Sequence, residues 1–175
     1  MHVNKTQVLC MDIHNFFPSI NINQVFEAFH CVGYTSDVAQ ALAQLCTHNA
    51  ILPQGAPTSP TLANIIFSPI DQQILNAIST KEITYTRYAD DLIFSSSHEL
   101  DFLIPLVSEI ISTNGFEINS NKTHLMKNPY RKMITGLIVT DTVKIPKYYK
   151  RKFNQELFYC EKYGVASHLK LSLIH

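Results

Sequence analysis

The 175 residues, 46% of them hydrophobic, are enough for one globular domain with a buried core and exclude a disordered chain. No apolar run reaches the roughly 18 residues that cross a bilayer, and the first residues lack the apolar core of a signal peptide. The net charge is zero, but residues 1–121 hold 3 Lys and Arg against 11 Asp and Glu, whereas residues 122–175 hold 11 against 3.

The first half of the chain predicts one strand and three helices. Residues 6–13 form an apolar run that ends in one charge, which is typical of a buried strand. A helix capped by Asn21 or Asn23 should end near Gly33, and a second should cover residues 36–47. A proline-rich loop at 52–60 should precede a long helix over 61–79. The expected inner faces of the second and third helices are Val38, Leu42 and Leu45, and then Leu62, Ile65, Ile66, Ile70 and Leu75.

The second half predicts a tight hairpin, a helix, short strands and a basic helix. Two β-rich runs, 83–89 and 92–96, are separated only by Asp90 and Asp91. A helix over 99–113 should carry Pro105 in its first turns and end at Gly115. Short strands are expected at 116–118, 133–139 and 143–145, the last two paired around 140–142, before a basic amphipathic helix over 148–163. This order of elements indicates an α+β fold with a small antiparallel sheet backed by helices.

Three aspartates stand where negative charge is costly. Asp12 ends an apolar strand, and Asp90 and Asp91 occupy the hairpin turn. Charges beside a core need compensation, and adjacent carboxylates repel each other unless a cation is present. Mg²⁺ takes such oxygen ligands, and two ions roughly 4 Å apart can activate a hydroxyl and stabilise a leaving pyrophosphate. Taken alone, however, an Asp-Asp pair is more often an ordinary surface turn.

Five segments occur in a fixed order around these aspartates. They are residues 11–20 (MDIHNFFPSI), 52–60 (LPQGAPTSP), 85–92 (YTRYADDL), 115–123 (GFEINSNKT) and 134–137 (ITGL). Together they resemble the palm motifs of bacterial reverse transcriptases of the retron and group II intron types, and the last segment leans toward retrons. The resemblance implies a polymerase palm with a ferredoxin-like core. It also implies an RNA-directed DNA polymerase that adds deoxynucleotides to a primer 3′-hydroxyl, with a retron-like role in antiviral defence.

The resemblance assigns the metal site residue by residue. Asp12 and Asp90 would bind two Mg²⁺ ions, Asp91 would complete the acidic cluster, and the backbone of Ile13 would take part. Lys122 would offset the cluster or meet a phosphate, although a lone lysine is more often simply solvated. No Cys-x-x-Cys pair or other zinc spacing accompanies these residues, and the four separated cysteines favour reduced thiols in the cytoplasm.

Nucleotide and primer contacts follow from the same resemblance. Backbone amides of residues 13–15, including that of His14, would face the triphosphate. Phe17 falls where the family places the ring that excludes a ribose 2′-hydroxyl, with ordinary core packing as the alternative. Gln54 would lie over the incoming nucleotide, and Tyr88 would contact the primer end or template. The neighbouring Arg87 is expected to pair with a carboxylate for structural reasons.

Domain organisation was inferred from the same motifs. Residues 1–146 should form the palm with a residual fingers segment, and residues 147–175 should begin a basic helical thumb. Phosphate contacts with primer and template are expected there, although a basic helix tip is commonly just a solvated face. The basic residues concerned are Lys147, Lys150, Arg151 and Lys152. Only eleven residues precede Asp12, so the chain is expected to be a fragment, or to need a second polypeptide for fingers or thumb.

Two other functions compete with polymerisation. A non-catalytic palm remnant could hold RNA through its basic C-terminal part, but the three intact aspartates count against decay. A nucleotidyl cyclase could use a similar sheet, but its Gly-Gly-acidic signature is absent from the sequence. The expected partners are therefore an RNA template, a DNA or RNA primer and dNTPs, with no membrane. The template RNA, the priming mode and the oligomeric state do not follow from the sequence.

Overall fold

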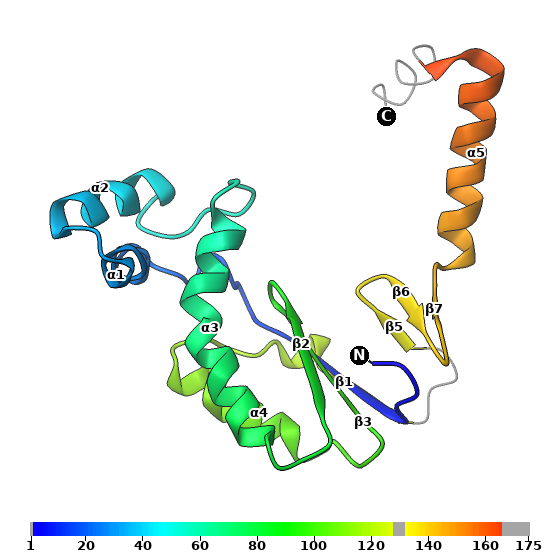
Figure 1. Ribbon diagram of the computed structural model, residues 1–175, viewed down its shortest axis with the longest axis horizontal. Coiled ribbons are helices and arrows are strands. Elements are labelled where there is room, and N and C mark those ends of the chain that lie inside the picture. Colours follow the sequence, from blue (N-terminus) through cyan, green and yellow to red (C-terminus); the bar gives the residue numbers. More distant parts are fainter. Residues whose placement is uncertain (1, 128–131, 166–175) are drawn as a thin grey trace. The chain divides into compact units, whose positions relative to one another are not determined.

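The computed structural model describes residues 2–127 and 132–165. The chain separates into two compact units, Met1–Pro129 and Tyr130–His175, which are described one after the other (Figure 1). No helix in the described ranges is long and apolar enough to span a membrane.

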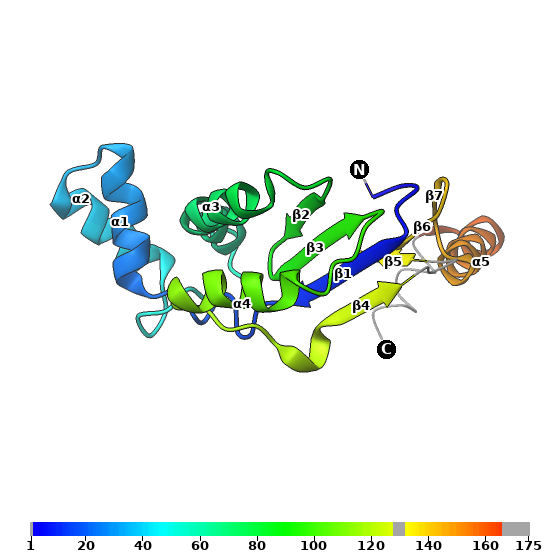
Figure 2. The same cartoon turned by 90° about the horizontal axis from the view of Figure 1, so that it is seen from below.

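The first unit contains a four-stranded antiparallel sheet and four helices. Its elements are β1 (Gln7–Asp12), α1 (Ile22–Val32), α2 (Ser36–Cys46), α3 (Ser59–Ile78), β2 (Thr84–Tyr88), β3 (Asp91–Ser96), α4 (Leu103–Thr113), the 3-10 turn η1 (Ser120–Lys122) and β4 (His124–Lys127). The strands lie in the order β2-β3-β1-β4 (Figure 2). Each neighbouring pair is antiparallel. With helices between β1 and β2 and between β3 and β4, this is the ferredoxin-like βαββαβ arrangement expected from the sequence.

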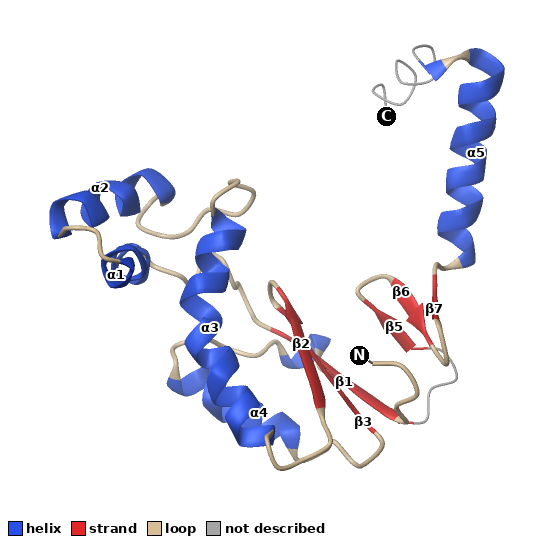
Figure 3. Ribbon diagram, viewed as in Figure 1, coloured by secondary structure: helices blue, strands red, loops and turns tan. Residues whose placement is uncertain are grey.

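One face of the sheet packs against α3 and α4. Leu9 and Met11 of β1 and Phe94 of β3 are fully or almost fully buried and share one cluster with Phe67 of α3 and Val107 of α4. Because side chains alternate along a strand, the even-numbered residues of β1 point to the opposite face. Figure 3 shows α3 and α4 on one side of these strands. The other side, here called the open face, carries no helix among the described residues of this unit, and His2 covers part of it through hydrogen bonds to Ser95 and Thr86.

Two helices bury different faces from those expected. In α2, Val38 and Leu45 are exposed, and Ala39 and Ala43 are buried instead, because α2 packs through its small residues. In α3, Ile65 and Leu75 are exposed. The buried residues of α3 follow a helical spacing and are Ser59, Leu62, Ala63, Phe67, Ile70, Ile74 and Ile78. For α3 the expected inner face is thus confirmed at Leu62 and Ile70, with Ile66 partly buried against the core, and wrong at Ile65 and Leu75.

Element boundaries were otherwise close to expectation, with one strand misplaced. The third helix begins at Ser59, with a proline in its first turn, where a missing N–H is tolerated. The fourth helix begins at Leu103, later than expected. The expected strand at 116–118 is wrong, since it makes only an isolated bridge between Ile118 and Ile13. The strand that pairs with β1 at one edge of the sheet is β4, which was not predicted.

The second unit has a small sheet and one long helix. Its elements are β5 (Lys132–Ile134), β6 (Leu137–Val139), β7 (Val143–Lys144) and α5 (Lys147–Tyr163), with the strands in that order. The single strand expected over 133–139 is wrong, because Thr135 and Gly136 turn with φ of 44° and 81° and divide it in two. The turn at 140–142 is confirmed. The short sheet shares its unit with α5, and the assignment to palm and thumb stays a prediction.

Candidate active site

The ends of β1 and β3 bring two carboxylates opposite each other. Asp12, the last residue of β1, pairs in register with Asp91, the first residue of β3. Paired residues of an antiparallel sheet point to the same face. Leu9 and Met11 of β1 and Leu92 of β3 belong to the core under the helices. By alternation, both aspartates therefore point to the open face of the sheet.

The third aspartate, Asp90, lies in the turn between β2 and β3. Its neighbour Ala89 has a φ of 50°, a left-handed conformation that costs a non-glycine residue roughly 1–2 kcal/mol. A backbone hydrogen bond of 3.0 Å from the Ile13 N–H to the Asp90 carbonyl fixes the turn to the residue after β1. The three predicted aspartates therefore come from two segments, the end of β1 and the turn before β3, which this backbone hydrogen bond connects.

Lys122 offsets part of the negative charge. Its Nζ lies 3.0 Å from Oδ2 of Asp12, whose side chain is 9% exposed. This hydrogen bond, with the charge of Asp12, raises the pKa of Lys122, and the charges of Asp90 and Asp91 add to the rise. The charge compensation expected from the sequence is confirmed. Contact between Lys122 and a phosphate stays a prediction.

The pKa of Asp91 reflects both its burial and the repulsion among the three carboxylates. Burial raises the pKa of its carboxyl above the usual value, and the charges of Asp90 and Asp12 raise it further. The nearby Lys122 ammonium acts in the opposite direction. The open end of the sheet therefore carries an excess of negative charge that a proton or a metal cation would relieve.

The chemistry of the three aspartates fits a divalent cation, since their oxygens are the hard ligands that Mg²⁺ prefers. Within residues 2–127 and 132–165, however, no three His, Cys, Asp or Glu side chains are already placed to hold a metal. One oxygen of Asp12 faces the Lys122 ammonium instead. An ion held by Asp12 and Asp90 would therefore share the Asp12 carboxylate with Lys122 or displace the lysine, and the metal site stays a prediction.

The first two amides after β1 are already used inside the protein. The Ile13 N–H donates to the Asp90 carbonyl at 3.0 Å, and the His14 N–H donates to the Glu117 carbonyl at 2.7 Å. The expectation that these two amides face a triphosphate is therefore wrong, because both are committed to neighbouring segments. The backbone then turns at Asn15, where φ is 46°. A contact of the triphosphate with the Asn15 amide stays a prediction.

The other residues predicted to meet nucleotide or primer lie at the surface or near it. Phe17 is partly buried and packs against the edge of the core. Gln54 is exposed in the loop before α3, which the Ser59 hydroxyl closes by donating to the Pro53 carbonyl. Tyr88, at the end of β2, is 73% exposed. All three are accessible to a ligand, and their roles stay predictions.

Arg87 forms the structural pair that the sequence predicted. Its Nε lies 3.0 Å from Oδ1 of Asp71, and its Nη2 lies 2.8 Å from Oδ2. The Tyr85 hydroxyl also donates to Oδ1 of Asp71, at 2.7 Å. Burial, together with this bond to a carboxylate, raises the pKa of Tyr85 well above its usual range. Asp71 was not predicted as the partner.

The predicted primer and template residues of the C-terminal part share one helix. All four lie in the first turns of α5 and are exposed: Lys147, Lys150, Arg151 and Lys152. They belong to the second unit, and their contact with a nucleic acid stays a prediction.

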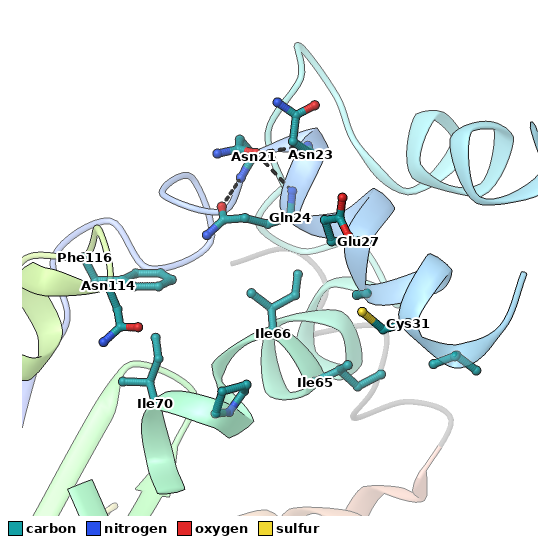
Figure 4. A pocket seen from close by; sticks show the side chains of 13 residues that line it. Asn21, Asn23, Gln24, Glu27, Cys31, Ile65, Ile66, Ile70, Asn114 and Phe116 are labelled. Carbon is teal, nitrogen blue, oxygen red and sulfur yellow. Dashed lines mark hydrogen bonds between the residues drawn. The ribbon is translucent and has the colours of Figure 1, made fainter. Parts of the chain in front are cut away.

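A groove of about 600 Å³ lies elsewhere in the first unit, between α1, α3 and the segment after α4 (Figure 4). Ile65 and Ile66 of α3 and Phe116 form much of its apolar wall, and Asn21 and Asn114 lie at its rim. The groove explains why Ile65 is exposed. None of the predicted catalytic residues lines it.

Comparison with known proteins agrees with this arrangement. Residues 2–150 match the family model described as reverse transcriptase (RNA-dependent DNA polymerase). The chain is 33% identical to the retron Ec86 reverse transcriptase of Escherichia coli over 178 residues, which cover 97% of this chain and 54% of that protein. It is 31% identical to the retron Mx65 reverse transcriptase of Myxococcus xanthus, covering 83% of this chain and 39% of that protein.

Solved structures show the same fold. The apo telomerase of Candida Tropicalis superposes with a TM-score of 0.61 and 13% identity, over 79% of this chain and 32% of that chain. A form of that telomerase truncated from its C-terminal domain gives a TM-score of 0.60 and 16% identity, over 80% and 35%. At these identities the likeness concerns the fold alone.

Proposed function

Because the chain belongs to the reverse transcriptase family, we propose that it acts as an RNA-directed DNA polymerase, extending a primer 3′-hydroxyl with deoxynucleotides. The observation that carries the proposal is the pairing of Asp12 with Asp91 on the open face of the sheet, with Asp90 tied beside them. The chain spans about half the length of the curated relatives that it matches, 54% and 39% for the two described above. The activity of these whole enzymes is therefore proposed for this chain.

Reverse transcriptases generally use divalent metal ions, and we propose two Mg²⁺ ions here. When bound, such ions stabilise charge on the attacking and leaving oxygens of the displacement. Asp12 and Asp90 would hold them, and Asp91 would keep the site strongly acidic. Lys122, released from Asp12, would then be free to meet a phosphate, which its 61% exposed side chain permits.

The exposed residues around the aspartates would select and position the substrates. Phe17 would exclude a ribose 2′-hydroxyl, Gln54 would cover the incoming nucleotide, and Tyr88 would meet the primer end. An RNA template paired with a DNA or RNA primer would be held through its phosphates, in part by the basic start of α5. The similarity to retron enzymes supports a retron-type polymerase.

The four cysteines support a location in a reducing compartment. All are free thiols, at Cys10, Cys31, Cys46 and Cys160. Free thiols are typical of cytoplasmic proteins. We therefore include the cytoplasm in the proposal.

Primer extension on an RNA template with Mg²⁺ and dNTPs tests the proposed activity. Asp90→Asn should slow extension by about 100-fold or more, since it removes a charge that acts on the reacting groups. Asp101→Asn is the matched control, because it makes the same change at a half-exposed residue that pairs with Lys127. The control should extend the primer as the wild type does.

Two results would contradict the proposal. Equal extension by the wild type and Asp90→Asn would remove the aspartates from the reaction. If the wild-type chain binds RNA but does not extend the primer, the non-catalytic RNA-binding function is favoured instead.

A further inference from the structure

One face of α3 forms a cradle for the Arg87 guanidinium. Asn64, Phe67 and Asp71 follow one another at helical spacings of three and four residues, so they share that face. The Asn64 side-chain oxygen accepts from Nη1 of Arg87 at 2.9 Å, and Asp71 binds the other edge of the guanidinium through two oxygens. The guanidinium carbon also lies 4.6 Å from the centre of the Phe67 ring.

The same guanidinium reaches the turn that carries Asp90. Nη1 of Arg87 donates to the Ala89 carbonyl at 3.1 Å. This carbonyl belongs to the peptide that joins Ala89 to Asp90, and Ala89 is the residue with the left-handed φ of 50°. The hydrogen bond therefore holds the peptide before Asp90, and rotation of this peptide would change the direction of the Asp90 side chain.

We propose that Arg87 is a positioning residue for the metal-binding turn. Held by the cradle of Asn64, Phe67 and Asp71, it fixes the left-handed Ala89 and thereby directs the Asp90 carboxylate toward Asp12. The proposal deepens the proposed function and rests on it. Arg87 itself touches neither substrate nor metal.

The cradle also links this turn to the loop that carries Gln54. The helix α3 begins at Ser59, directly after that loop, and the Ser59 hydroxyl donates to the Pro53 carbonyl. One helix thus supports both the predicted nucleotide loop and the turn with Asp90. A lysine at position 87 could keep the charge but not the directed hydrogen bonds of the guanidinium, because an ammonium is not a planar fork.

Nuclear magnetic resonance of the ¹⁵N-labelled full chain tests the proposal with two readouts. The three-bond coupling between the amide and α protons of Ala89 reports its φ. Titration with Mn²⁺ alone broadens the amide signals nearest the bound ion. Arg87→Lys should change the Ala89 coupling and raise the Mn²⁺ concentration needed for half-broadening by about tenfold or more, as the loss of residues that orient metal ligands typically does.

Two further variants keep the test decisive. Asn64→Ala removes one partner of Nη1 from an exposed position, so it should fold even if Arg87→Lys does not, and it should shift both readouts in the same direction. Val107→Ala opens the fully buried core away from the turn and controls for lost stability. It should leave the Ala89 coupling and the Mn²⁺ titration unchanged.

The outcomes separate this proposal from the proposed function. An unchanged Ala89 coupling and Mn²⁺ titration in folded Arg87→Lys, or in Asn64→Ala if the former is unfolded, would overturn the positioning role. Equal losses in Val107→Ala would overturn it too, because the effect would then be general destabilisation. If Asp90→Asn titrates with Mn²⁺ like the wild type, the proposed metal site itself fails, whatever Arg87 does to the turn.

Discussion

The raised pKa of Asp91 makes the unfavourable negative charge of the site measurable. Its raised pKa means that the folded protein holds the carboxyl proton more tightly than the unfolded chain does. The free energy of unfolding is therefore higher below the usual pKa of 3.8 and falls as the pH rises through the raised value. Without a metal, ionised Asp91 costs stability at neutral pH.

Asp91→Asn should accordingly raise the melting temperature of the metal-free protein at pH 7. The gain should shrink as the pH is lowered toward 4, since the wild-type carboxyl then takes up its proton. Circular dichroism melts across this range would measure it, with Asp101→Asn as the control for a half-exposed carboxylate. A variant no more stable than the wild type at pH 7 would show that the repulsion is not present.

Cys10, on the strand that ends in Asp12, gives a test of burial and charge together. Burial, followed by the negative charge of Asp91, raises the pKa of the Cys10 thiol to about 11. The thiolate is the reactive form, so alkylation of Cys10 by iodoacetamide should be slow at pH 8 and accelerate only above pH 10. Exposed Cys31 should react faster at pH 8. Mass spectrometry of the alkylated peptides measures both rates, and faster reaction of Cys10 at pH 8 would contradict its burial beside Asp91.

Some of the site could be predicted from single residues, and some could not. Asp12, Asp90 and Asp91 stand out because charges interrupt apolar runs, and that signal is local. Asp71 gives no such signal, since it lies among polar residues of a helix and meets Arg87 only when α3 packs on the sheet. The hydrogen bond of the Ile13 amide to the Asp90 carbonyl likewise could not be predicted, because it joins segments far apart in the chain.

At the scale of elements, sequence rules predicted correctly those features that depend on neighbouring residues alone, such as helix caps. The capping box at the start of α1 is an example, because Asn21 accepts from the Gln24 amide and the Gln24 side chain accepts from the Asn21 amide. The inner face of α2 is a counterexample. Its contacts run through Ala39 and Ala43, so the position of its neighbour, and not the size of its apolar residues, decides what is buried.

Removing the cap of α1 should weaken the first unit by a moderate amount. Asn21→Ala should lower the free energy of unfolding by about 1 kcal/mol, since two backbone amides lose their acceptor. Asn23→Ala is a nearby control, because Asn23 is exposed inside the first turn and alanine favours helix there. Urea denaturation measures both, and an equal loss in the two variants would contradict the capping role.

At the scale of the whole molecule, the large hydrophobic cluster lies in the first unit, whereas the second unit buries Ile134, Ile138 and Val139 of its small sheet. The largest buried cluster begins at Leu9 and ends at Phe116, within Met1–Pro129. In the part of the second unit that the structure describes, α5 has no buried residue. Element order predicted the α+β class, and the resemblance to reverse transcriptases implied the ferredoxin-like sheet. The predicted boundary between palm and thumb, at residues 146 and 147, stays a prediction.

The first unit should therefore fold without the second. A chain ending at residue 129 should keep a cooperative thermal transition and dispersed amide signals, because it retains the whole cluster around β1, β3, α3 and α4. Comparison with the full chain by calorimetry tests this. A broad, non-cooperative transition in the shorter chain would mean that the second unit is needed for folding.

The dependence of single-nucleotide incorporation on free Mg²⁺ tests the central claim most directly. With two ions held at Asp12 and Asp90, the initial rate on an RNA template should rise with the square of the Mg²⁺ concentration when the metal is scarce, and it should vanish in EDTA. Asp12→Asn should lose nearly all incorporation. Incorporation that persists in EDTA, or an unchanged Mg²⁺ dependence in Asp12→Asn, would contradict the assignment of this site.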